Sequence, residues 1–80
     1  MLSNYIRSSM SNAKYEILSD DGTFYGEIPS FQGVYANAKT LEQCREELEE
    51  VLEEWIFFRI ARNLSLPIVD GNELRIKEVA

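Results

Sequence analysis

The chain has 80 residues, with 8 basic and 14 acidic side chains, a formal net charge of −6 and no histidine. This length suffices for one domain with a small hydrophobic core, a size that usually gives only marginal stability. The negative charge argues against a nucleic-acid-binding surface and against a surface for anionic lipid, and it favours a basic partner.

The single cysteine and the distribution of apolar residues further limit the kind of protein that this chain can be. The lone Cys44 excludes an internal disulfide, which predicts a reducing, cytoplasmic location and a small buried thiol. There is no run of about 18 apolar residues and no charged-then-apolar leader, so we expect neither a membrane span nor a secretion signal. Without a histidine to activate Cys44 or to act as a base, we predict no enzyme activity, no cofactor and no metal site.

Residues 1–13 are polar and rich in serine, yet their apolar side chains recur at helical spacing. This pattern allows a short helix that packs on the rest of the domain. The residues concerned are Leu2, Tyr5, Ile6, Met10 and Ala13.

Two strand-like runs, Lys14 to Asp20 and Thr23 to Ile28, flank the pair Asp21-Gly22, which predicts a β-hairpin. If that pair is a two-residue loop, the register places Leu18 opposite Tyr25, Ile17 opposite Gly26 and Glu16 opposite Glu27. One face then carries Tyr15, Ile17, Phe24 and Ile28, and Gly26 lets a helix approach it closely.

The other face of the hairpin is acidic and contains two apolar side chains. We interpret it as a partner-binding surface made by Glu16, Leu18, Asp20, Tyr25 and Glu27. Two other interpretations stay open: a solvated polar face, or a divalent-cation site of the kind that clustered carboxylates form. The cation site is disfavoured because the chain has no histidine or other base at hand.

Val34 to Ala38 predicts a third short strand, and Thr40 to Arg62 predicts one long amphipathic helix. Thr40 and Gln43 form a capping box, and Arg59 lies in the last turn, where a helix dipole favours positive charge. The apolar arc comprises Leu41, Cys44, Leu48, Val51, Leu52, Trp55 and Phe58, and the acidic arc comprises Glu42, Glu46, Glu49, Glu50 and Glu53.

Two features of this helix do not follow from folding alone. Several glutamates four residues apart repel one another, so the acidic stripe is either a solvated face or a mimic of RNA phosphates. The run Trp55 to Phe58 surrounds the helix with apolar side chains, which requires burial under the N-terminal helix, under the C-terminal tail or between subunits. We predict a homodimer or tetramer with an interface formed by Ile56, Phe57, Ile60 and Leu64.

After the helix, Asn63 is a candidate left-handed stop and Pro67 prevents continuation. Leu66 to Val69, a turn at Asp70 to Asn72 and a last strand at Leu74 to Val79 complete the pattern. The predicted organisation is a single domain over 1–80, with an N-terminal extension (1–13), a core (14–67) and a C-terminal strand (68–80). The predicted fold class is α+β, with a mainly antiparallel sheet of three or four strands packed on one long helix.

The order of these motifs resembles the HicB family of antitoxin-like proteins. The matching features are the Asp21-Gly22 hairpin, Ile28-Pro29, Gly33-Val34, the helix start at Thr40 to Gln43, and Leu66-Pro67 after the helix. The resemblance spans roughly residues 14–67. It implies a β-β-β-α-β, partial ribonuclease-H-like fold and a role in a toxin–antitoxin system, in which the protein neutralises a small mRNA-cleaving HicA toxin.

The chain departs from that family in two places. Gln43-Cys44 stands where the family has Glu-Ala, and no long basic segment follows Val69 to form the DNA-binding helix-turn-helix or ribbon-helix-helix of longer HicB proteins. We therefore expect no direct nucleic-acid binding and predict a protein-interaction module for a basic HicA-like toxin. The alternatives are a self-assembling structural domain and a degenerate ribonuclease-H-like nuclease with weak metal binding.

Overall fold

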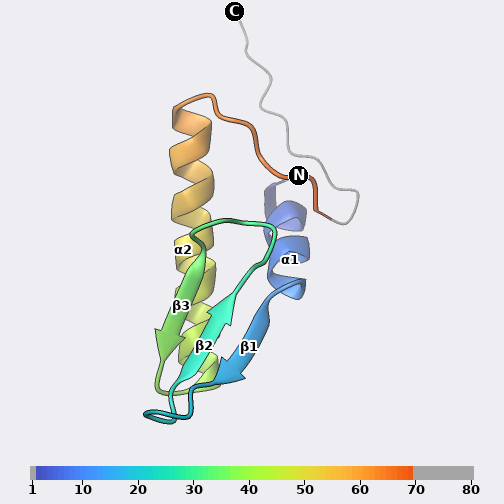
Figure 1. The fold of residues 1–80 in the computed structure, drawn as a ribbon. Helices are drawn as coiled ribbons and strands as arrows, with labels where there is room; N and C mark the ends of the chain where they lie inside the picture. The colour runs from blue at the N-terminus through green and yellow to red at the C-terminus, as the bar shows by residue number, and fades with distance from the viewer. Residues whose placement is uncertain (1, 70–80) are drawn as a thin grey trace, which may run out of the picture.

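The computed structural model describes residues 2–69 of the chain. The elements follow in the order α1 (Leu2–Ser11), β1 (Lys14–Ile17), β2 (Phe24–Glu27), β3 (Tyr35–Ala38) and α2 (Leu41–Ala61). The strands form one antiparallel sheet in the order β1-β2-β3, α2 covers one of its faces, and α1 packs beside α2 (Figure 1). This is the predicted α+β fold with its N-terminal helix. The predicted turn and last strand at 70–79 lie outside the described residues.

The register of the β1–β2 hairpin differs from the predicted one. Lys14 pairs with Glu27 and Glu16 pairs with Tyr25, so Glu16 and Glu27 are not opposite each other. The reason is a longer loop: the Leu18 N–H donates to the Thr23 carbonyl at 2.8 Å, leaving Ser19 to Gly22 as a four-residue connection. A shift by two residues keeps each side chain on its predicted face because side chains alternate along a strand.

Local chemistry explains why the loop is longer. The Asp21 carboxylate accepts hydrogen bonds from the Thr23 N–H at 3.0 Å and from the Thr23 hydroxyl at 2.7 Å, and Gly22 takes the left-handed conformation at φ 71°. Aspartate favours such a turn because its side chain can bond the backbone two residues on. Asp21 and Gly22 therefore end the loop instead of forming its whole length.

Helix α2 begins and ends where the sequence predicts. The Thr40 hydroxyl accepts a hydrogen bond from the Gln43 N–H at 3.1 Å, which satisfies one of the free N–H groups at the helix start. Beyond the last turn, Asn63 adopts φ 55°, the left-handed stop expected from its type. The Arg59 guanidinium donates from Nε to the Ser65 carbonyl at 2.7 Å and so holds the chain just after the turn.

The N-terminal half of α2, which is the lower half in Figure 1, lies directly against the sheet where the strands carry small residues. Cys44 is fully buried, and its thiol lies 3.6 Å from the Ala36 carbonyl as a weak donor. A Cβ atom added to Gly26 would lie 2.8 Å from the Tyr15 ring and 3.1 Å from the Cys44 sulfur. Gly26 is therefore required for the close approach of helix and sheet, as its position in the strand predicted.

The upper half of α2 extends past the strands and is covered instead by α1 and two loops (Figure 1). Tyr5 of α1 packs edge-to-face on Phe31 with ring centroids 6.1 Å apart, and Phe31 packs in the same way on Trp55 at 5.0 Å. The Tyr5 hydroxyl donates to the Pro67 carbonyl, which joins the first helix to the segment after α2. This end of the molecule therefore has its own aromatic core.

The buried side of α2 differs in part from the predicted apolar arc. Its fully buried side chains are Cys44, Leu48, Leu52 and Ile56, whereas Leu41 and Phe58 are 48% and 53% exposed. Ile56, predicted for an oligomer interface, is 1% exposed and belongs to the core; this part of the prediction is wrong. Buried positions four residues apart drift around a helix of about 3.6 residues per turn, which moves the core away from Phe58.

Ile17 is a second departure, since it is 65% exposed although it lies on the face of the hairpin that turns toward the helix. It occupies the last position of edge strand β1, opposite Phe24, where the helix does not reach it. Within residues 2–69, no helix combines the length and the apolar composition that crossing a bilayer requires.

Candidate functional site

The outer face of the sheet is the surface that no described helix covers, and it faces the viewer in Figure 1. Its side chains form two cross-strand rows. Lys14, Glu27 and Tyr35 make the first, and Glu16, Tyr25 and Asn37 make the second. Five of these six residues are exposed, and Tyr25 is half-buried between its neighbours.

Two tyrosines, one on the central strand β2 and one on the edge strand β3, lie side by side on this face. The rings of Tyr25 and Tyr35 are stacked with an interplanar angle of 26° and centroids 6.2 Å apart, on adjacent strands. Burial, reinforced by the nearby carboxylates of Glu27 and Glu16, raises the pKa of Tyr25 above its ordinary value. The phenol, like any tyrosine at neutral pH, is protonated and can donate a hydrogen bond, while the ring faces attract cations.

A hollow of about 480 Å³ adjoins the tyrosine pair where the chain between β2 and β3 bends away from the sheet. Tyr25, Tyr35 and Glu27 border it on the sheet side, and the segment Ile28 to Val34 closes the other side. Gly33, at φ 91°, allows the bend in this segment. The hollow combines aromatic ring faces with a carboxylate, which is the chemistry that receives a guanidinium or ammonium group.

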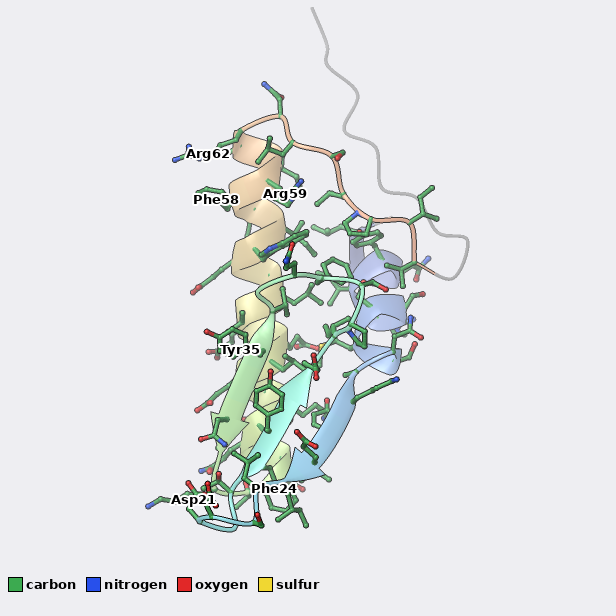
Figure 2. The ribbon with its side chains drawn as sticks, viewed as in Figure 1. Asp21, Phe24, Tyr35, Phe58, Arg59 and Arg62 are labelled. Carbon is green, nitrogen blue, oxygen red and sulfur yellow. The ribbon has the colours of Figure 1, made fainter. Side chains whose placement is uncertain are left out.

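The lower end of this face is held rigidly by hydrogen bonds. The Asn37 amide of β3 donates to the Thr23 hydroxyl at 2.8 Å and to the Phe24 carbonyl at 2.9 Å. Thr23 in turn donates to Asp21, and hydrogen bonding from Thr23 lowers the pKa of the Asp21 carboxyl. Asp21 therefore remains charged at the tip of the hairpin, which Figure 2 shows at the far end of the sheet from Tyr35.

The structure brings together three of the five residues predicted for partner binding. Glu16, Tyr25 and Glu27 lie on the outer face, whereas Leu18 follows the end of β1 and bonds to Thr23, and Asp20 lies in the hairpin connection. Sequence reasoning missed Tyr35 and Asn37. Their alternation with Ala36 and Ala38 places them on the outer side of a strand packed on a helix, and this signal could have identified them.

The carboxylates do not gather into a metal site among the described residues. No three acidic or cysteine side chains within residues 2–69 lie close enough together to hold a metal ion. The changed register separates Glu16 from Glu27, so the opposed pair that motivated a divalent-cation site is absent.

Cys44 is the one thiol in the chain, and it lies on the other side of the sheet. Burial, with a smaller effect from Glu47, raises the pKa of this thiol above its ordinary value. Since the thiolate is the nucleophilic form, Cys44 has the character of a core residue and not of a reactive group.

Comparisons with known proteins agree with this architecture. The UPF0150-like family matches residues 4–67. UPF0150 protein ssl0259 from Synechocystis sp. (strain ATCC 27184 / PCC 6803 / Kazusa) is 35% identical over 57 residues, 71% of this chain and 78% of that protein. The crystal structure of TTHA0281 from Thermus thermophilus superposes with a TM-score of 0.91 at 32% identity, over 96% of this chain and 95% of that one. The chain therefore belongs to the UPF0150 family.

Proposed function

We propose that this protein is an interaction module that binds a small basic protein through the outer face of its sheet, as a HicB-like antitoxin would bind an mRNA-cleaving toxin. The observation that carries the proposal is the stacked Tyr25–Tyr35 pair, which no described helix covers and which has Glu16 opposite Tyr25 and Glu27 opposite Tyr35. Catalysis is not part of the proposed function.

An arginine or lysine of the partner fits this surface for three reasons. The ring faces of the tyrosine pair attract a cation, the Glu27 carboxylate beside the hollow can pair with it, and the Tyr25 hydroxyl remains protonated and able to orient a polar neighbour. The chain's net charge of −6 adds long-range attraction for a basic protein. A toxin that cleaves RNA needs such a basic surface for its own substrate, so a protein covering that surface would inhibit it.

Rigid aromatic anchors should supply affinity, and the surrounding charge should mainly accelerate encounter. Tyr25 and Tyr35 present two large rings on neighbouring strands, at little cost in conformational entropy because the sheet holds them. The carboxylates lie at the rim, where solvent screens them. The two kinds of residue should therefore affect different rate constants.

Co-expression with the product of the adjacent gene, followed by rate measurements at low and high salt, tests the proposal. We expect a complex whose association slows as salt rises. Glu16→Gln with Glu27→Gln should slow association about tenfold at low salt, and Tyr25→Ala with Tyr35→Ala should mainly accelerate dissociation.

A matched control removes the same charge elsewhere: Glu42→Gln with Glu46→Gln on the exposed side of α2. This pair should leave the rates nearly unchanged, because it lies on the opposite side of the molecule from the tyrosines. Equal slowing by both double variants would show that net charge alone governs binding. Failure to form a complex with a basic protein would refute the proposed function.

A further inference from the structure

The upper end of α2 exposes a second surface, distinct from the outer face of the sheet. Phe57 is 59% exposed, Phe58 is 53% exposed and Leu64, just beyond the helix, is 43% exposed. Figure 2 shows Phe58 and Arg62 on the side of α2 turned away from α1. Adjacent exposed aromatics on a rigid helix are unusual for an isolated soluble domain and indicate a contact surface.

Charge along this side of α2 changes sign around the aromatics. Glu46, Glu50 and Glu54 lie on the exposed face before them, spaced four residues apart so that they repel one another. After them comes Arg62, whose guanidinium lies 4.4 Å from the centre of the Phe58 ring. The exposed face therefore runs from negative, through aromatic, to positive toward the end of the helix.

This order of charge indicates which molecule binds the exposed surface of α2. We infer that a second copy of this chain packs on α2 with its own α2 antiparallel, around a two-fold axis at Phe57 and Phe58. Glu54 lies about one turn before the axis and Arg62 about one turn after it, so reversing the helix direction brings Arg62 of one copy level with the partner's Glu54. A parallel arrangement would instead set the glutamates of the two copies against each other.

The helix surface suits such an approach. Ala61, one turn beyond Phe57, is small and exposed, so the partner helix meets no bulky side chain there. Antiparallel helices cross favourably at shallow angles when their side-chain ridges interlock. The aromatic rings would supply the buried centre and the Arg62–Glu54 pairs the polar rim, the arrangement typical of specific interfaces.

The inferred dimer is independent of the proposed function. Its interface uses the exposed side of α2, whereas the Tyr25–Tyr35 surface lies on the far face of the sheet. A dimer would therefore present two open sheet faces and bind two partner molecules. Of the interface residues predicted from sequence, Phe57 and Leu64 are exposed, Ile60 is half-buried, and Ile56 is excluded by its burial.

Sedimentation equilibrium of the full chain at concentrations of micromolar order and above tests the inference. We expect a dimer for the unaltered protein and a rise of at least about tenfold in the dimer dissociation constant for Phe58→Glu. Arg62→Glu and Glu54→Arg should each weaken the dimer, and combining them in one chain should restore it. Glu42→Lys, an equal charge change far from the axis, is the control and should leave the dimer unchanged.

Restoration by the double variant is the decisive result, because it requires residues 54 and 62 to meet across two copies. Circular dichroism melting shows whether each variant folds. A monomer at all concentrations, or single charge reversals that leave the dimer intact, would overturn the inference. Protection of Phe57 and Phe58 from chemical labelling in a monomer would likewise overturn it and assign their cover to residues 70–80 of the same chain.

Discussion

The two halves of α2 obey the same helical geometry but have different neighbours. The lower half contacts the sheet at two small residues, Gly26 and Ala36, and its buried side chains Cys44 and Leu48 are 0% exposed. The upper half has left the sheet and packs on rings from α1 and the β2–β3 connection, and it leaves Phe57 and Phe58 uncovered. The sheet thus leaves Leu41 as the one large apolar side chain exposed in the lower half, whereas α1 and the loops leave two adjacent phenylalanines exposed in the upper half.

The buried line of α2 shows why the halves differ. Successive buried residues, Cys44, Leu48, Leu52 and Ile56, are four positions apart, and each step turns the line by about 40° around the helix. The line therefore begins against the sheet and ends facing α1. The spacing of apolar residues in the sequence places Phe58 on the apolar arc of the helix. Because the buried positions rotate around the helix axis, Phe58 lies outside them and remains exposed.

The largest expected contrast between the halves comes from truncating one apolar side chain in each. Leu48→Ala should lower the free energy of unfolding by about 2–5 kcal/mol, because a fully buried side chain leaves a cavity against the sheet. Phe57→Ala should cost the folded protomer far less, since the ring is 59% exposed. Urea unfolding at a protein concentration too low for dimer formation measures both without a contribution from the interface. Similar losses would show that both halves are equally buried.

Gly26→Ala tests the close packing of the lower half by adding a methyl group, whereas the previous variants remove side-chain atoms. The new methyl group would meet the Tyr15 ring at 2.8 Å and the Cys44 sulfur at 3.1 Å, so we expect a loss of about 1–3 kcal/mol. Gly22→Ala is unsuitable as a control because its φ is positive. Ala13→Gly and thermal unfolding provide a baseline for glycine–alanine exchange. An unchanged melting temperature for Gly26→Ala would mean that the sheet and helix can separate without cost.

Thr40→Ala tests the start of the lower half. The Thr40 hydroxyl caps the Gln43 N–H at 3.1 Å, and its loss should destabilise the protein by about 1 kcal/mol. Thr40→Ser keeps the acceptor oxygen and should retain most of the stability. Chemical unfolding of the pair separates the cap from the bulk of the side chain; equal losses would rule out the capping role.

Tyr5→Phe tests how the upper half is held. It removes the hydroxyl that donates to Pro67 and should cost about 0.5–1.5 kcal/mol. Burial raises the pKa of Tyr5, so the folded state favours the protonated phenol: its contribution is complete below the ordinary value near 10.0 and is lost as pH rises through the higher folded value. Stability measured across alkaline pH should fall more steeply for the unaltered chain than for Tyr5→Phe. Parallel curves would contradict this linkage.

On the outer face of the sheet as well, the sequence pattern determined some features and tertiary packing determined others. Alternation along the hairpin correctly assigned Glu16, Tyr25 and Glu27 to one face, because a two-residue slip preserves the side of each residue. The pairing itself was wrong, since Asp21 bonds to Thr23 and lengthens the loop. Tyr35 joins the site only through the pairing of β2 with β3.

The sequence by itself determined the elements, the caps of α2, the small residues at its contact with the sheet and the acidic character of the outer face. These depend on neighbouring residues and on periods that a chain carries locally. Tertiary structure decided the hairpin register, the burial of Ile56, the exposure of Phe58 and the stacking of Tyr25 on Tyr35. Each of these depends on which distant segment covers a side chain, and the helical period of α2 alone cannot say where the sheet ends and α1 begins.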